Sequence, residues 1–220
     1  MRVPTAPRAP RARLALRTLA VALLLGLLVA ATAACAPEPT PIPGHPKVRI
    51  EVEGGYAMTL ELYPEFAPKT VANFLSLVDA GFYDGLTFHR VIKDNFIQGG
   101  DPKGDGTGGS DQRIKGEFAE NGFAQNTLSH TFGTISMARS TDKNSATSQF
   151  FIVACDNNPS AWDGKYAAFG RLVDGTNDLL ALSAKPVEAN ASGEVSKPVD
   201  PLVIVRIVRV DDAATPTPAT

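Results

Sequence analysis

The chain contains few of the residues that form disulfides or bind metals. Its 220 residues include two cysteines, Cys35 and Cys155, and three histidines. Because cysteine, histidine and acidic residues nowhere recur at the spacing of a metal site, we expect neither a metal nor another cofactor. Cys155 follows the apolar run 150–154, a position that favours a small residue packed at a strand end over a reactive thiol.

The first 34 residues lack acidic side chains. They contain five arginines, which precede an uncharged run over residues 18–34. A basic segment followed by an apolar segment is typical of a signal peptide. Residues 32–35 read TAAC and resemble a bacterial lipobox, in which the cysteine is lipidated and becomes the new N-terminus. We therefore expect residues 1–34 to be a lipoprotein signal peptide and Cys35 to carry the lipid, which leaves no disulfide within the chain.

An uncleaved signal anchor is the alternative for the N-terminal segment. Its 17 uncharged residues lie at the lower limit for a helix that spans a membrane. Both alternatives place the rest of the chain outside the cytoplasm. The lipoprotein form predicts an extracytoplasmic protein that is anchored to the cell membrane through Cys35.

The rest of the chain lacks an excess of basic residues. Residues 35–220 hold 16 basic and 23 acidic side chains, which gives a net charge of −7. Binding to a phosphate backbone requires a basic face, so nucleic acid is not an expected partner. No feature of the sequence indicates oligomerisation, and we expect a monomer.

Proline and a low apolar content mark the two ends of the predicted domain. Residues 36–46 contain five prolines, which oppose both helix and sheet and favour an extended spacer. With Cys35 they form a predicted tether over residues 35–46. Residues 212–220 are poor in apolar side chains and are predicted to be a disordered tail. The folded domain is expected over residues 47–211.

Short strand patterns outnumber helical patterns within this domain. Apolar residues spaced at i, i+3, i+4 and i+7 predict a helix over residues 67–80, and a second helix is predicted over residues 176–183. Two-residue alternation and apolar runs predict strands at 48–52, 57–62, 87–91, 96–98, 134–138, 149–154, 168–173 and 202–210. The pattern favours a mainly β fold, a closed antiparallel eight-stranded β-barrel capped by two α-helices.

Two segments carry the strongest functional signal. Residues 88–101 read FHRVIKDNFIQGGD, and residues 148–152 read SQFFI. Arg90 and Gln98 are polar residues within a strand-like apolar context. An arginine keeps its proton and presents a rigid fork of donors, so it is poorly suited to act as a general base. Such a side chain suits a site that holds a carbonyl or stabilises a distorted amide.

Together these segments closely resemble the signature of the cyclophilins, the β-barrel peptidyl-prolyl isomerases, over about residues 47–211. The resemblance implies that Arg90 donates a hydrogen bond to the twisted X-Pro amide and that Gln98 orients Arg90. It implies an isomerase that accelerates X-Pro rotation in exported proteins and assists their folding, without metal or cofactor. The simpler alternative for Arg90 is a surface ion pair with Asp94 or Glu117.

The resemblance also implies a groove for proline-containing polypeptides. Gln149 would line this groove, Phe151 would form part of the proline pocket, and Met137 and Ala138 match the strand that binds the substrate backbone. The glycine-rich residues 104–109 resemble the loop that lets the backbone approach the groove closely. The expected substrate-binding residues are Phe88, Phe96, Met137, Ala138, Gln149, Phe151, Trp162 and Tyr166.

Three places depart from the family pattern. Asn95 stands where a pocket phenylalanine is common, so either Phe96 fills that space or the pocket is partly polar. Arg139 replaces a common asparagine. The family tryptophan is displaced by one position, which leaves Ala161, and the family histidine becomes Tyr166. These departures predict an altered pocket and could lower the activity.

Two other functions remain open on the sequence. The same barrel could be a non-catalytic binding module for proline-containing segments, which the altered pocket residues would favour. It could also be a structural protein of the cell envelope that uses the barrel only as a scaffold.

Overall fold

The computed structural model describes residues 44–155 and 161–210, which belong to the compact unit Pro39–Thr220. The signal peptide predicted at 1–34, the lipidation site Cys35, most of the tether and the tail predicted at 212–220 lie outside the described residues. Within the described ranges, no helix has both the length and the apolar character needed to cross a membrane.

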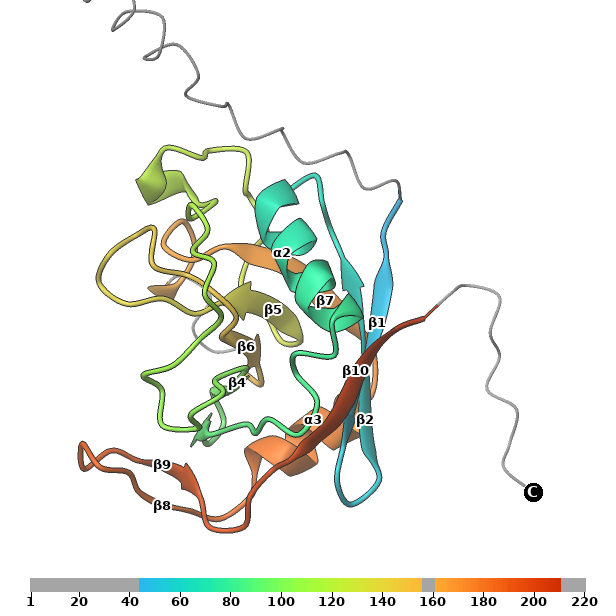
Figure 1. Cartoon of the computed structure of the whole chain (residues 1–220), viewed down its shortest axis with the longest axis vertical. Coiled ribbons are helices and arrows are strands. Elements are labelled where there is room, and N and C mark those ends of the chain that lie inside the picture. The colour runs from blue at the N-terminus through green and yellow to red at the C-terminus, as the bar shows by residue number, and fades with distance from the viewer. Residues whose placement is uncertain (1–43, 156–160, 211–220) are drawn as a thin grey trace, which may run out of the picture. The chain divides into compact units, whose positions relative to one another are not determined.

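An eight-stranded sheet, antiparallel at every pairing, forms the body of the domain and curls around the main core (Figure 1). Its order is β10-β1-β2-β7-β5-β6-β4-β3. The strands are β1 (Lys47–Val52), β2 (Tyr56–Leu62), β3 (Arg90–Ile92), β4 (Phe96–Gly99), β5 (Thr134–Met137), β6 (Phe150–Val153), β7 (Ala168–Asp174) and β10 (Ile204–Val210).

Two α-helices accompany the sheet, as the sequence predicts: α2 (Pro68–Asp79) and α3 (Thr176–Ser183). They lie toward opposite ends of the sheet in the view of Figure 1. A short 3-10 helix, η1 (Ala119–Asn121), and a two-stranded hairpin of β8 (Val187–Ala189) and β9 (Val195–Pro198) were not predicted.

The prediction of a closed barrel is wrong, because the sheet stays open between β3 and β10. The two edges approach only ahead of these strands, where Thr87 forms an isolated bridge with Val203. There the backbone N–H of Phe88 donates to Leu202 O at 2.9 Å. Farther along, β9 rather than β10 lies against β3, so the ladder that would close the barrel does not continue.

Helix α2 begins without a side-chain cap from the preceding Ala67. Pro68 suits the first turn because its missing N–H would have no partner there. The carboxylate of Glu117, far along the chain, accepts hydrogen bonds from Lys69 N at 3.0 Å, Thr70 N at 2.8 Å and Thr70 Oγ1 at 2.8 Å. A remote buried carboxylate thereby caps the helix and ties a long loop to it.

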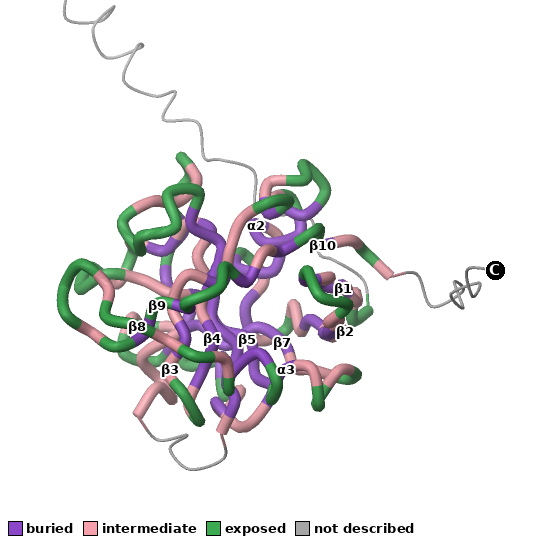
Figure 2. The backbone as a smooth tube through the Cα atoms, turned by 90° about the horizontal axis from the view of Figure 1, so that it is seen from below, coloured by how far each residue is buried: buried purple, intermediate pink, exposed green. Residues whose placement is uncertain are grey.

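Strands β4 and β6 separate two clusters of buried side chains, because successive residues of a strand point to opposite faces. On one face, Ile97, Phe150 and Ile152 join the main core. On the other, Phe96, Phe151 and Val153 form an aromatic cluster, against which Ile92, Ala138, Cys155, Trp162 and Tyr166 pack. Figure 2 shows buried segments gathered around β4, β5 and β7. Strands β4 and β6 therefore contribute side chains both to the main core and to the candidate site.

Candidate active site

Arg90 and Gln98 face each other across β3 and β4. Arg90 Nη1 donates to Gln98 Oε1 at 3.1 Å, and Gln98 Nε2 donates to Gln149 Oε1 at 2.9 Å. Gln149 Nε2 in turn donates to the carbonyls of Gly108 at 2.7 Å and Gly106 at 3.1 Å. Gln98 and Gln149 each accept a hydrogen bond through the amide oxygen and donate one through the amide nitrogen. The row of hydrogen bonds therefore runs in one direction, from Arg90 to the glycine-rich loop. The glycine-rich loop thus helps to orient the guanidinium.

An aromatic pocket of about 270 Å³ adjoins this row. Its lining residues are Arg90, Phe96, Gln98, Ala138, Arg139, Phe151, Trp162 and Tyr166. The ring of Phe151 lies 5.6 Å from Phe96, 5.6 Å from Trp162 and 5.7 Å from Tyr166. The Arg90 guanidinium carbon lies 4.9 Å from the centre of the Phe96 ring. Aromatic walls with one fork of donors suit an apolar ring attached to a polar amide.

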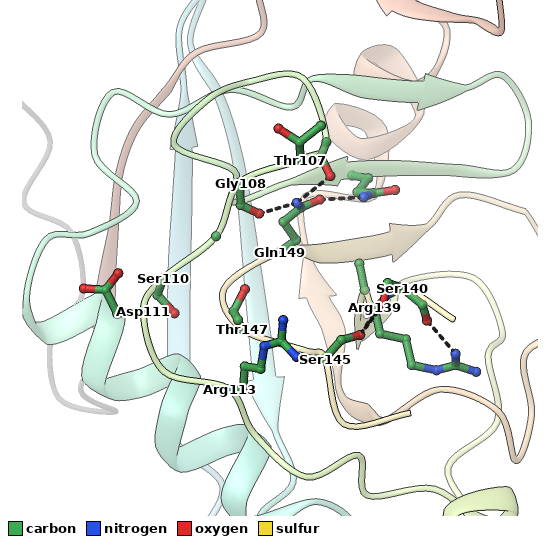
Figure 3. A pocket seen from close by; sticks show the side chains of 14 residues that line it. Thr107, Gly108, Ser110, Asp111, Arg113, Arg139, Ser140, Ser145, Thr147 and Gln149 are labelled. Atoms are coloured by element: carbon green, nitrogen blue, oxygen red, sulfur yellow. Dashed lines mark hydrogen bonds between the residues drawn. The ribbon is translucent and has the colours of Figure 1, made fainter. Parts of the chain in front are cut away.

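A second pocket, of about 390 Å³, lies beside the aromatic pocket and is shown in Figure 3. The glycine-rich loop from Gly106 to Asp111 forms one side, and Arg139, Ser140 and Ser145 lie on another. The two pockets share Gln98, Ala138 and Arg139. The second pocket is lined mainly by polar residues, whereas aromatic side chains line the first.

Phe96 and Asn95, which are adjacent in the sequence, differ in their position relative to the pocket. Phe96 lines the aromatic pocket, whereas Asn95 accepts a weak hydrogen bond from Cys155 Sγ at 3.9 Å. Phe96 therefore fills the space, and Asn95 does not make the pocket polar. Trp162 and Tyr166 both line the pocket in spite of the displaced motif.

Arg139, which the sequence marked only as a departure, lines both pockets. Its guanidinium carbon lies 4.6 Å from the centre of the Tyr166 ring, a favourable cation–π arrangement. Its Nε and Nη2 donate to the carbonyl of Lys165 at 3.1 and 2.9 Å. Arg139 therefore braces one wall of the site.

Two residues predicted to bind substrate lie in the main core instead. Phe88 is fully buried and packs edge-to-face against Phe150, and Met137 is 1% exposed. The other predicted residues, Phe96, Ala138, Gln149, Phe151, Trp162 and Tyr166, line one or both pockets together with Arg90 and Gln98.

The acidic partner of Arg90 is Glu194, not Asp94 or Glu117. Arg90 Nε and Nη2 donate to the two carboxylate oxygens of Glu194, each at 2.7 Å. Glu117 is bound to the start of α2 instead. Glu194 lies 104 residues from Arg90 in the sequence, in a hairpin whose strands were not predicted, so no local pattern could have identified it.

His130 packs against Phe151, one of the residues that line the aromatic pocket. Its ring is 1% exposed and stacks on Phe151 at 5.9 Å with an angle of 10° between the planes. Its Nδ1 lies 2.8 Å from Asp163 Oδ1, and its Nε2 lies 2.9 Å from Ser136 Oγ. Burial lowers the pKa of His130, and the neighbouring Asp163 opposes part of that shift. The neutral ring is therefore part of the packed site.

Lowering the pH from about 7.5 to about 6 is expected to reduce the free energy of unfolding. The pKa of His130 is lowered from 6.5 in the folded protein, so the unfolded chain binds a proton that the folded chain resists. This stability is complete above the unfolded pKa and is lost as the pH falls toward the folded one. Urea unfolding at the two pH values would measure the loss.

A His130→Asn variant should show a smaller loss over the same pH interval. Some pH dependence should remain, because burial also lowers the pKa of His89. An equal loss in the variant and the wild type would contradict the assignment to His130.

Among the described residues, no three histidine, cysteine, aspartate or glutamate side chains cluster closely enough to hold a metal ion. The groups that line the two pockets include the guanidinium groups of Arg90 and Arg139, the amides of Gln98 and Gln149, and aromatic rings. These groups can bind and polarise an amide.

Comparison with known proteins gives a consistent result. Residues 47–209 match the family model described as cyclophilin type peptidyl-prolyl cis-trans isomerase/CLD. The chain is 41% identical over 169 residues to the peptidyl-prolyl cis-trans isomerase-like 1 of Neurospora crassa, with 75% of this chain and 96% of that protein covered.

Solved structures agree with the sequence comparison. A cyclophilin type peptidyl-prolyl cis-trans isomerase from Cryptosporidium parvum superposes with a TM-score of 0.66 at 33% identity, covering 77% of this chain and 99% of that one. A second crystal structure of that protein, obtained in the presence of the dipeptide Ala-Pro, gives a TM-score of 0.65 at 34% identity, with 76% and 99% covered.

Proposed function

Because the chain belongs to the family of cyclophilin-type peptidyl-prolyl cis-trans isomerases, its activity is the rotation of X-Pro peptide bonds, and we propose that Arg90 supplies the hydrogen bond that accelerates this rotation. The observation that carries the proposal is the position of the Arg90 guanidinium on the wall of the aromatic pocket, next to Phe96. A proline ring held by Phe96, Phe151 and Trp162 would place its amide nitrogen beside that guanidinium.

The chemistry requires a donor but no covalent step. Resonance flattens the amide and raises a rotational barrier of about 18–20 kcal/mol. At the transition state the amide is twisted, resonance is lost, and the proline nitrogen regains a lone pair that can accept a hydrogen bond. A guanidinium N–H placed there stabilises the twisted amide more than either planar form, which lowers the barrier.

The rest of the site supports this role through orientation. Gln98 and Gln149 connect the guanidinium to the glycine-rich loop, so Arg90 need not be reoriented at the moment of reaction. Donors that are organised in advance cost little reorganisation energy, which is why they contribute strongly to catalysis. The Ala-Pro dipeptide used with the Cryptosporidium parvum relative supports proline-containing segments as the substrate class for this chain.

The test is cis–trans exchange of an Ala-Pro peptide, measured by NMR with the full-length protein beside a variant that lacks the guanidinium. A non-catalytic binding module would bind the peptide without exchange between its cis and trans signals. A protein that uses the fold only as a scaffold would do neither.

We further propose that the protein acts on exported polypeptides from a lipid anchor. The support comes from the sequence alone: basic residues, then the uncharged run 18–34, then Cys35 in a lipobox-like context. The five prolines of residues 36–46 would hold the domain away from the membrane surface.

Replacing Cys35 with alanine is expected to remove the lipid anchor in a bacterial host. Nearly all of the protein should then leave the membrane fraction, or it should keep its signal peptide uncleaved. Two acyl signals are needed for stable anchoring, and the modified cysteine would be their attachment point. Detergent phase separation with mass spectrometry of the N-terminal peptide would measure both effects.

A Cys155→Ala variant is the matched control and should keep both the anchor and the processed N-terminus. If the Cys35→Ala variant were to stay in the membrane fraction with the same mass as the wild type, the lipoprotein proposal would fail in favour of an uncleaved signal anchor.

A further inference from the structure

The β8–β9 hairpin brings a carboxylate into the site that neither the sequence motifs nor the aromatic pocket account for. Glu194, just before β9, binds the edge of the Arg90 guanidinium formed by Nε and Nη2, through two hydrogen bonds of 2.7 Å each. The hairpin lies beside β3, the strand that carries Arg90 (Figure 2). A paired, two-point contact of this kind fixes the plane of a guanidinium as well as its position.

The turn of the hairpin is built to hold Glu194 in place. Asn190 Oδ1 accepts from the backbone N–H of Ser192 at 2.9 Å and of Glu194 at 3.0 Å. The backbone N–H of Asn190 donates to Glu194 O at 2.8 Å, and Gly193 takes the left-handed conformation with φ of 85°. Ser196, which is fully buried, receives a hydrogen bond from Asn190 Nδ2 at 3.2 Å. Glu194 is therefore presented by an ordered turn.

The contact leaves donors available for a substrate. A guanidinium has five N–H groups, of which two are bound to Glu194 and one to Gln98. One N–H on Nη1 and one on Nη2 remain without a partner among the described residues. Because Arg90 lines the aromatic pocket, these are the groups that can reach a bound amide.

We propose that Glu194 is a positioning residue of the isomerase, which holds the Arg90 guanidinium so that its remaining N–H groups face the aromatic pocket. The inference rests on the proposed role of Arg90 as the donor. Two effects of the carboxylate oppose each other, since it orients the donor but also neutralises part of its charge. Orientation dominates, because a hydrogen bond to the amide nitrogen weakens steeply when the N–H is misaligned.

The pair persists across the pH range in which proteins work. The hydrogen bonds from Arg90, together with one from Ser196, lower the pKa of Glu194 to about 2. The carboxylate is therefore ionised at neutral pH and also in mildly acidic solution. Glu194 therefore holds the Arg90 guanidinium in the same way across this pH range and does not act as a pH switch.

The test compares Glu194→Gln with the wild type in the full-length protein. The amide keeps the size of the side chain but cannot accept two parallel hydrogen bonds. We expect the on-enzyme exchange rate of an Ala-Pro peptide to fall roughly tenfold, because a misplaced catalytic group reacts slowly. The dissociation constant of the peptide should change by less than about twofold, since the aromatic rings of the pocket are untouched. NMR line-shape analysis separates these two quantities.

A second readout reports directly on the guanidinium. The Arg90 Nε–H signal should shift and exchange faster with water in Glu194→Gln, because its acceptor is weakened. Glu188→Gln is the matched control: Glu188 lies on the same hairpin and pairs with the exposed Lys197 at 2.9 Å, away from Arg90. This control should leave the rate and the Arg90 signal unchanged.

Two results would overturn the inference: an exchange rate in Glu194→Gln that equals or exceeds the wild-type rate, or an equal fall in Glu188→Gln. The proposed function fails separately. If removal of the Arg90 guanidinium leaves the rate unchanged, Arg90 is not the donor. If that removal abolishes exchange while Glu194→Gln does not alter it, only the role of Glu194 is lost.

Discussion

Replacing Arg90 with alanine is expected to lower the catalysed exchange of an Ala-Pro peptide by about a hundredfold, the usual effect of removing a donor that acts in the transition state. The substitution removes the N–H groups that face the aromatic pocket but leaves Phe151 and Trp162 in place. Peptide binding should therefore weaken much less than the rate, because the lost interaction forms mainly in the twisted amide. NMR exchange spectroscopy on one sample gives both the rate and the affinity.

Arg206→Ala provides a matched control for this prediction. Arg206 makes a similar two-point contact with a carboxylate, that of Glu51, at 2.8 and 3.2 Å, but on an exposed part of β10 and β1. Its loss should leave the rate unchanged. If Arg90→Ala keeps more than about half of the wild-type rate, Arg90 is not the essential donor and another group in the pocket has to supply the hydrogen bond.

Replacing Glu117 with alanine is expected to lower the free energy of unfolding by about 2 kcal/mol. The buried donors lose their acceptor, which destabilises the fold, and this loss is partly offset because a charge is no longer buried. Glu117 is 2% exposed, and Thr70, which donates to it twice, is fully buried. The N-cap residue Ala67 supplies no side-chain cap to α2. The melting temperature should fall by about 4–8 °C for a domain of this size.

Glu120→Ala is the comparison for Glu117. Glu120 lies three residues along in η1 and approaches Lys143 at 3.9 Å on the exposed surface. Such pairs contribute little, so its loss should cost less than about 0.5 kcal/mol. Chemical denaturation followed by Trp162 fluorescence would measure both variants. Equal and small effects would show that α2 does not depend on the remote cap.

The parts of the fold that local patterns specify were predicted well. The apolar spacing between Val71 and Val78 predicts helix α2, and the helix predicted over residues 176–183 coincides with α3. The β8–β9 hairpin escaped prediction because its strands are three and four residues long and largely exposed. The open edge between β3 and β10 could not be predicted either, since it depends on which distant strand meets β3 and not on the composition of β3.

The residues of the candidate site, like the elements of the fold, include some that local sequence patterns could predict and some that they could not. Motif residues such as Arg90, Gln98 and Phe151 come together as the sequence indicates, because neighbouring strands bring them there. Glu194 and His130 were missed as members of the site, since each contributes through partners far away in the chain. Phe88 belongs to the same motif as Arg90 but lies in the core. It precedes β3, which begins at Arg90, so the alternation of that strand does not determine where its side chain points.

The alternation along β4 and β6 bears on how such a protein can diverge. Ile97 and Phe150 hold the interior together, whereas Phe96 and Phe151, one position away, shape what enters the pocket. Point replacements on the pocket side can therefore alter ligand preference while the interior stays the same. An insertion or deletion of one residue in either strand would exchange the two sets of side chains at once. Divergence in this family should thus spare the length of these strands and concentrate length changes in the loops around them.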